Sequence, residues 1–248
     1  MSDPAVEYSI PIPDIEHLVT EDDTPLDNFQ SEKQQRLLVE SLYSSTVISV
    51  PFVAAANVGL FYGVRQDPIV PDVLLSLNVE MPTDWSQKKN RSYFVWEFGK
   101  VPEICLEIVS NREGNELGTS RRRESKKDLY ARIGVSYYAV FDPLRQLQEP
   151  DQMDGELLRV WALTVGRYGS LEAPFWLESV GLGLTVWEGE FEGVSGPWVR
   201  WCDRQGQVIP TGKERADQEQ LRANQAQLRA DRLAERLRAM GIDPDLEE

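Results

Sequence analysis

The segment Ile104-Cys105-Leu106-Glu107-Ile108-Val109-Ser110 is an apolar, strand-like run interrupted by a single acid. A run upstream, Pro71-Asp72-Val73-Leu74-Leu75, has the same character and also carries one acid. An ionised carboxylate is costly to bury in such a strand unless a cation or hydrogen-bond donors compensate it. Residues 121–130, just downstream, are rich in Arg and Lys. Two strand acids with basic residues nearby are what a site for a hard divalent metal requires.

These residues define a candidate metal site. Magnesium takes oxygen ligands, usually from one or two carboxylates, waters and substrate phosphate. If the two strands are neighbours, Asp72 and Glu107 supply the carboxylates and the main-chain carbonyl of Ile108 adds a third oxygen. Bound Mg²⁺ or Mn²⁺ would polarise a phosphate and lower the pKa of an attacking water. A lysine near the acids, Lys126 or Lys127, would stabilise the developing negative charge.

A plainer interpretation fits the same residues. Aspartate after proline is common at turns and strand starts, where its side chain bonds local amides. Glu107 would then be an exposed residue on one face of an antiparallel strand, and the basic run would be a solvated helix face. The residue pattern alone leaves both interpretations open.

Composition and charge narrow the class of protein. The 248 residues fit one large domain with an appendage, and 41% of them are hydrophobic, enough for a sizeable core. No stretch approaches the ~20 apolar residues of a membrane span, and no secretory signal is visible, so we expect a cytoplasmic protein. The net charge of −15 argues against nucleic-acid binding by the whole surface. Residues 1–30 contribute −8 of that charge, and basic clusters stand at 88–91 and 121–127.

The pattern of apolar and turn residues predicts a mixed α/β chain. A helix is expected from residue 28 to 44, capped by Asp27 or Ser31, and a second helix over 121–133. Strands are expected at 47–53, 58–62, 69–77, 93–97, 103–109 and 136–141. Further β structure is expected at 157–163 and 182–190, and as a hairpin over 198–209.

The chain divides into three parts by composition. Residues 1–27 are expected to form an extended acidic arm, 28–210 the folded domain and 211–241 a helical tail. Small and apolar residues recur along the tail at spacings of three and four, a coiled-coil-like seam: Ala223, Ala226, Ala230, Leu233, Leu237 and Met240. A helix docked on its own domain and a weakly dimerising helix fit this seam equally well.

An ordered set of short motifs resembles the Uma2 family of restriction-endonuclease-like proteins. The motifs are Pro71-Asp72, Glu107-Ile108-Val109-Ser110, Lys126-Lys127-Asp128-Leu129-Tyr130, Gly134-Val135-Ser136-Tyr137-Tyr138 and Phe141-Asp142-Pro143. The resemblance covers roughly residues 28–210 and implies the fold of the PD-(D/E)XK nucleases, a mixed sheet flanked by helices. Extra β-hairpins and a C-terminal helix would extend that core.

The resemblance also implies roles for individual residues. Asp72 becomes the first metal-binding acid and Glu107 the second. Val109 occupies the position where the superfamily usually has its lysine, and in Uma2-like proteins that lysine lies on the following helix. Lys126 is preferred to Lys127 because it precedes Tyr130 by four residues, so the two share a helix face.

A helix-borne acid joins some superfamily sites, and two residues are candidates here, Glu32 and Glu40. Relatives often carry a His at the start of the first helix, where this chain has Gln30 and Ser31.

The implied activity is magnesium-dependent hydrolysis of DNA phosphodiester bonds. DNA would be contacted by a local basic cluster: Arg121, Arg122, Arg123, Lys126 and Lys127. The main alternative is a nuclease fold without turnover that forms homodimers or larger oligomers through its tail. A DNA-binding module without catalysis is a third hypothesis, which the charge of −15 disfavours.

Overall fold

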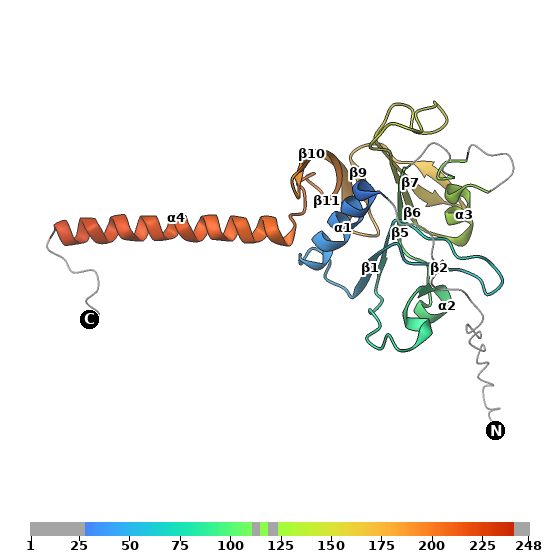
Figure 1. Ribbon diagram of the computed structural model, residues 1–248, viewed down its shortest axis with the longest axis horizontal. Helices are drawn as coiled ribbons and strands as arrows, with labels where there is room; N and C mark the ends of the chain where they lie inside the picture. The colour runs from blue at the N-terminus through green and yellow to red at the C-terminus, as the bar shows by residue number, and fades with distance from the viewer. Residues whose placement is uncertain (1–27, 111–114, 119–123, 241–248) are drawn as a thin grey trace, which may run out of the picture. The chain divides into compact units, whose positions relative to one another are not determined.

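The computed structural model describes residues 28–110, 115–118 and 124–240 (Figure 1). The expected acidic arm, residues 1–27, lies outside these ranges. The chain divides into two compact units, one ending at Ile209 and the other beginning at Pro210. The first unit is built on a mixed sheet and contains both acids singled out in the sequence.

The central sheet has six strands in the order β1-β3-β5-β6-β7-β8. Only β5 and β6 are parallel neighbours; the other pairs are antiparallel. Its strands are β1 (Phe52–Ala56), β3 (Val73–Leu77), β5 (Ile104–Ile108), β6 (Tyr137–Phe141), β7 (Leu158–Thr164) and β8 (Arg167–Ser170). A second sheet contains β9 (Phe175–Leu177), β10 (Leu182–Phe191) and β11 (Val194–Cys202), and β2 (Leu60–Phe61) pairs with β4 (Tyr93–Phe94). The expected mixed α+β architecture with extra hairpins is confirmed.

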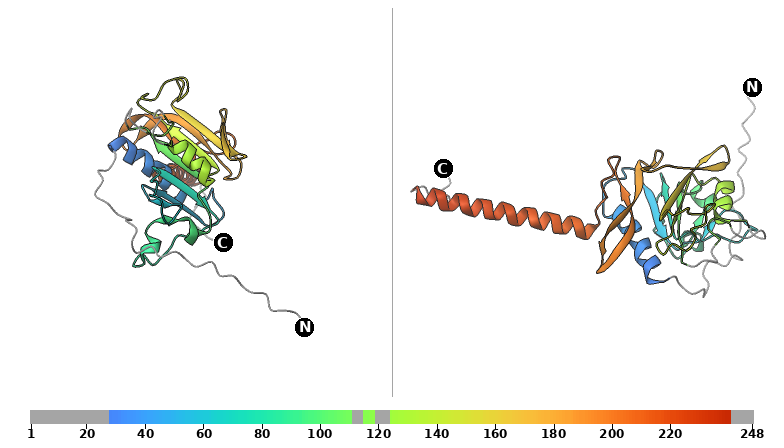
Figure 2. Two further views of the ribbon diagram at one scale, coloured as in Figure 1. Left: turned by 90° about the vertical axis from the view of Figure 1, so that its right-hand side faces the viewer. Right: turned by 90° about the horizontal axis from the view of Figure 1, so that it is seen from above.

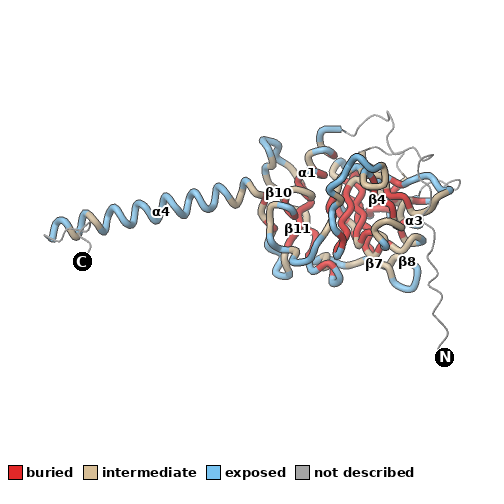
Figure 3. The backbone as a smooth tube through the Cα atoms, turned by 90° about the horizontal axis from the view of Figure 1, so that it is seen from below, coloured by how far each residue is buried: buried red, intermediate tan, exposed pale blue. Residues whose placement is uncertain are grey.

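Both faces of the central sheet are covered, which explains its continuous apolar strands. Helix α1 (Phe29–Tyr43) and the three-stranded sheet cover one face, where Leu38 packs with Leu106 and Trp201. Helix α3 (Lys126–Ile133) covers the other, where Tyr130 packs with residues of β3, β5 and β6. All five positions of β3, β5 and β6 are therefore buried. Figure 2 gives two further views of these layers, and Figure 3 shows that the buried backbone gathers in the interior of the first unit. A strand buried on both sides does not alternate between apolar and polar residues.

A buried glutamine joins α1 to the three-stranded sheet. The side-chain amide of Gln34 donates to the carbonyl of Val199 at 2.8 Å and accepts from its N–H at 2.8 Å. Gln34 is fully buried. It therefore pairs the outer edge of β11 in the way that a neighbouring strand would.

We expect Gln34→Ala to lower the free energy of unfolding by about 2–4 kcal/mol, because a buried N–H and a buried carbonyl lose their partners. Urea unfolding followed by circular dichroism measures the change. Gln30→Ala, the same substitution on the half-buried first turn, is the control and should stay within about 0.5 kcal/mol of the parent. Equal stability of the two variants would show that Val199 does not depend on Gln34.

The two helices of the first unit begin at residues other than those expected. Asn28 caps α1, because its side chain accepts from the N–H of Ser31 at 3.0 Å. Ser31 is therefore not the cap, and Asp27 lies outside the described residues. Helix α3 begins at Lys126 instead of residue 121, because Ser125 caps it by accepting from the N–H of Asp128 at 3.0 Å.

Several strand boundaries also differ. Strand β1 is Phe52–Ala56, not 47–53, and within 93–97 only β4 is extended, since Val95–Phe98 forms the short helix α2. The expected hairpin over 198–209 is present but short. The N–H of Asp203 donates to the carbonyl of Gln207 at 2.9 Å across the turn, and the pairing beyond it is limited to a bridge between Cys202 and Val208 and a bond from the N–H of Ile209 to the carbonyl of Trp201 at 2.8 Å. Along its length β11 pairs instead with β10. One edge of β11 is hydrogen-bonded to β10, and Gln34 bonds the other edge at Val199.

The second unit contains helix α4 (Gly212–Ala239), which confirms the expected tail helix. A capping box starts it: Thr211 accepts from the N–H of Glu214, whose carboxylate accepts from the N–H of Thr211. Ion pairs one turn apart, such as Lys213 with Asp217, lie along it. Whether two such helices associate stays a prediction. Among the described residues, none of the helices combines the length and apolar character needed to cross a lipid bilayer.

Candidate functional site

The strand register brings the two predicted acids together. Val73 pairs with Leu106 in the antiparallel β3–β5 ladder, so the next step of the register sets Asp72 beside Glu107. On the other side of Asp72, the N–H of Asn57 donates to its main-chain carbonyl at 3.3 Å. Glu107 pairs in turn with Val140 of β6. The acids therefore occupy one level of the sheet, at the end where β3 begins and β5 finishes.

Hydrogen-bond donors compensate the carboxylate of Asp72. Its Oδ2 accepts from the N–H of Ile108 at 2.5 Å and its Oδ1 accepts from the side-chain amide of Gln35 at 3.1 Å. Gln35 is held in turn by Asn57, whose amide donates to Gln35 Oε1 at 3.0 Å. Asp72 thus connects β3, β5 and α1, and its orientation is set by groups from all three.

Glu107 is fully buried and is compensated by α3. Its Oε2 lies 2.6 Å from Nζ of Lys126, and its Oε1 accepts from the hydroxyl of Tyr130 at 2.8 Å. Lys126 and Tyr130 are one helical turn apart and face the sheet together. The interpretation of Glu107 as an exposed strand residue is wrong, because Glu107 is completely buried.

The charge of Lys126 is maintained by its neighbours. Burial by itself lowers the pKa of this ammonium, but the negative charge and hydrogen bond of Glu107, with smaller contributions from Asp72 and Glu116, raise the pKa above its ordinary value. Lys126 is therefore a cation at neutral pH, placed beside both predicted acids.

Lys127 lies elsewhere, although it is the next residue. Its Nζ stands 4.3 Å from the ring centre of Trp161, and burial followed by the nearby charge of Arg159 lowers its pKa. Both described members of the predicted DNA-binding cluster, Lys126 and Lys127, are thus turned toward the sheet. The other three members, Arg121, Arg122 and Arg123, lie outside the described residues.

The structure adds a third acid that the sequence pattern did not single out. Glu116 is 8% exposed, and no described residue bonds its buried Oε2. Burial raises the pKa of its carboxyl, and the charge of Lys126 opposes that rise. Glu116 belongs to a polar stretch without strand or helix periodicity, so its burial could not be inferred from the chain.

Helix α1 contributes an amide instead of an acid. Gln35 is the residue that reaches Asp72, whereas Glu32 forms a surface ion pair with Arg36 at 2.9 Å. Glu40 is half-buried and lines a shallow depression next to Gln35. The structure therefore joins α1 to the acids through a neutral side chain.

The oxygens at this site suit a small hard cation. Across the described ranges, no group of three or more His, Cys, Asp or Glu side chains could hold a metal ion. Two carboxylates are nevertheless enough for Mg²⁺, which keeps several waters. The N–H of Ile108 points toward Asp72, and the carbonyl of a strand residue points to the same edge as its N–H. Asp72, Glu107 and the Ile108 carbonyl are thus the groups that could hold a cation, with the carboxylate oxygens exchanging some of the bonds described above for the metal.

Comparisons with known proteins identify a matching family and a similar solved structure. A family model described as Uma2, "Putative restriction endonuclease", matches residues 20–176. One similar solved structure is described as a putative nuclease belonging to DUF820 from Anabaena variabilis ATCC 29413. The two chains are 14% identical, with a TM-score of 0.37, and the match covers 62% of this chain and 73% of the other. No curated protein matches.

Proposed function

The chain belongs to the Uma2 family, whose members are described as putative restriction endonucleases, and we propose on that basis that it hydrolyses DNA phosphodiester bonds with Mg²⁺ or Mn²⁺. The observation that carries the proposal is the buried carboxylate of Glu107, ion-paired to Lys126 and adjacent to Asp72. Burying an acid with a lysine and a second acid costs free energy of desolvation, so a contribution to stability does not by itself explain this arrangement.

In the proposed site, Asp72, Glu107 and the carbonyl of Ile108 hold the metal. When bound, a divalent cation polarises the scissile phosphate and lowers the pKa of the attacking water. Lys126, whose ammonium is held 2.6 Å from Glu107, stabilises the negative charge that develops on the phosphate. DNA is the proposed substrate, with Arg121, Arg122 and Arg123 as phosphate-contacting residues.

Two further residues are positioning residues in this proposal. Tyr130 donates to Glu107 and Gln35 donates to Asp72, so each acid is oriented by a side chain from a helix. Such hydrogen bonds fix the direction of a ligand oxygen and keep it aimed at the metal. The sequence pattern had identified Tyr130 only by its spacing from Lys126, and it gave no indication of Gln35.

We expect Mn²⁺ to raise the unfolding temperature of the parent protein. A ligand at 100 times its Kd stabilises the folded state by about 2.7 kcal/mol, which amounts to roughly 5 °C for a domain of this size. Asp72→Asn should abolish most of that rise, while Glu178→Gln, which changes an exposed acid in the turn after β9, should keep it. Differential scanning fluorimetry measures the shift, and calorimetric titration measures binding directly. Absence of Mn²⁺ binding would favour the alternative, an inactive nuclease fold that associates through its tail.

A further inference from the structure

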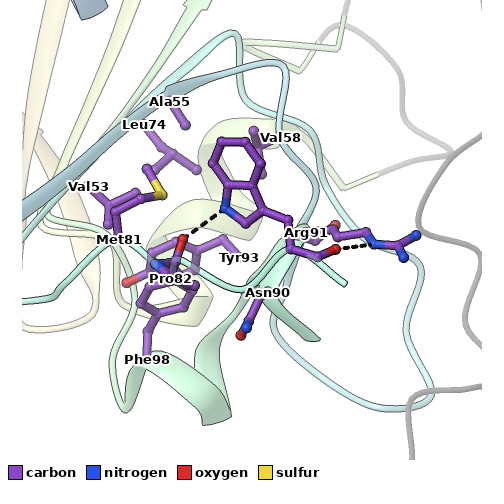
Figure 4. Close-up of a pocket in the computed structure, with 12 residues that line it drawn as sticks. Val53, Ala55, Val58, Leu74, Met81, Pro82, Asn90, Arg91, Tyr93 and Phe98 are labelled. Atoms are coloured by element: carbon purple, nitrogen blue, oxygen red, sulfur yellow. Dashed lines mark hydrogen bonds between the residues drawn. The ribbon is translucent and has the colours of Figure 1, made fainter. Parts of the chain in front are cut away.

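A pocket of about 410 Å³ lies beside edge strand β1 and has no part in the reaction proposed above (Figure 4). Its volume is within the range of small-molecule sites. Strands β1 and β3 form one wall, and the segment from residue 81 to 98 forms the rest. The residues that matter for the argument are Ala55, Leu74, Met81, Trp85, Tyr93 and Phe98.

The pocket lies on the same face of the central sheet as Glu107. Leu74 lines the pocket and pairs with Cys105 of β5, so these two side chains share a face. Glu107 is two residues beyond Cys105, and Asp72 is two residues before Leu74. Side chains two residues apart on a strand point the same way and are separated by about 7 Å, so Glu107 shares the face of Cys105 and Leu74. Asp72 precedes β3, and its carboxylate accepts from Gln35 of α1. Leu74, on the pocket wall, is thus one strand repeat from the level of the acids, a distance that a single nucleotide unit bridges.

Three aromatic side chains line the pocket and are held in place. The indole of Trp85 is 66% exposed, yet its N–H donates to the carbonyl of Pro82 at 2.8 Å. Arg91 donates to the Trp85 carbonyl at 3.0 Å and fixes the same loop. Below them, Tyr93 and Phe98 stack with ring centres 4.2 Å apart. An exposed but fixed ring over an apolar pocket is a preformed platform for another planar group.

Positive charge borders the platform. The basic cluster at 88–91 forms the 3-10 turn η1 (Lys88–Asn90) and Arg91, directly before the buried wall residue Ser92. The acids of this segment are engaged: Glu97 pairs with Lys89 at 3.3 Å, and Asp84 accepts from Ser86 and Gln87. Aromatic surface next to a basic edge is the combination that binds unpaired bases and their phosphates.

We propose that this pocket receives an unpaired nucleobase of the nucleic-acid substrate, from the nucleotide next to the phosphate held at Asp72 and Glu107. The inference rests on the proposed function, since it assigns a substrate feature to the same face of the sheet. The base comes from a single strand or is extruded from a duplex, and in both cases it stacks on Trp85.

The test is equilibrium binding of a short fluorescent oligonucleotide, measured by anisotropy in EDTA so that no cleavage occurs. Trp85→Ala and the pocket-filling Ala55→Leu should each weaken binding of single-stranded DNA about tenfold. In a series of oligonucleotides, each has one abasic site at a different position. One of them should bind the parent protein about tenfold more weakly than the intact strand does. The same oligonucleotide should bind Trp85→Ala no more weakly than the intact strand binds that variant. Trp176→Ala, which removes an indole from the three-stranded sheet, is the control and should bind as the parent does.

The outcomes separate this inference from the proposed hydrolysis. Base-dependent binding without cleavage in Mn²⁺ supports the pocket and contradicts the hydrolysis. Cleavage with equal affinities for abasic and intact strands, or for Trp85→Ala and parent, overturns the pocket and leaves the hydrolysis standing. A duplex with one mismatch, compared with a fully paired one, shows whether the base is extruded. Circular dichroism checks that both variants fold. If Trp85→Ala does not fold, Ala55→Leu still tests the pocket, because it keeps the indole of Trp85.

Discussion

Asp72→Asn should lower the rate of Mn²⁺-dependent DNA cleavage at least about 100-fold, the scale on which loss of one preorganised electrostatic group slows a reaction. The substitution keeps the size of the side chain and an oxygen that accepts from the N–H of Ile108. It removes the negative charge that a divalent cation requires. Conversion of supercoiled plasmid to nicked circles, followed over time in Mn²⁺, measures the rate.

Glu107→Gln should reduce cleavage to the same degree, because it removes the other proposed carboxylate ligand. Glu178→Gln removes one exposed carboxylate far along the chain and should cleave at the parent rate. Each variant is purified identically, so a contaminating nuclease would act equally in all samples. Cleavage that persists in both Asp72→Asn and Glu107→Gln would contradict the assignment of these acids as metal ligands.

Lys126→Met should lower the free energy of unfolding by about 3 kcal/mol in metal-free buffer. The substitution leaves Glu107, whose side chain is 1% exposed, without its cation. Removing one partner of a buried ion pair costs about 3–5 kcal/mol, and the 29% exposure of the Lys126 side chain places the expectation at the lower end. Urea unfolding at neutral pH measures the change.

A double-mutant cycle tests the reason for this loss. Glu107→Gln combined with Lys126→Met removes both charges, so it should be more stable than Lys126→Met alone. Lys127→Met is the matched control; it loses a contact with the Trp161 ring and should cost only about 0.5–1 kcal/mol. Additive effects of the two substitutions would show that the ion pair does not couple them. Mn²⁺ should restore part of the stability of Lys126→Met if a cation binds at Glu107.

The expected loss of cleavage in Glu107→Gln and the expected loss of stability in Lys126→Met both depend on the carboxylate of Glu107. In the metal-free protein the ammonium of Lys126 compensates Glu107, and Tyr130 occupies its other oxygen. In the proposed reaction the same carboxylate faces a divalent cation, so Lys126 is available to a phosphate. The ion pair is thus both a stabilising element and the proposed charge-stabilising group of the site.

Continuous apolar runs were enough to identify the strands at which the acids stand. Runs such as residues 104–108 have no polar face, and the structure buries both sides of them. A charged residue inside such a run requires compensation, so Asp72 and Glu107 could be recognised as unusual before any contact was known. The spacing of four between Lys126 and Tyr130 likewise predicted a shared helix face, and both side chains meet Glu107.

Other features depend on residues that are distant along the chain. Gln35 and Glu116 lie in segments whose polarity indicates exposure, and only packing buries them both and brings Gln35 to Asp72. The hairpin at 198–209 is shorter than expected for a similar reason, because β10 and Gln34 bond the edges of β11. Local patterns contain no information about which distant segment takes a strand edge.

The chain's local pattern therefore predicted most of the element types, the unusual positions of Asp72 and Glu107 and the face shared by Lys126 and Tyr130. Tertiary structure decided that Asp72 stands beside Glu107, that Lys126 and not Lys127 reaches Glu107, and that an aromatic pocket has a wall residue, Leu74, one strand repeat away. The reason is physical. Burial periodicity is a property of neighbouring residues, whereas the bond from Ile108 to Asp72 spans 36 residues and forms only when β3 and β5 pair in one register.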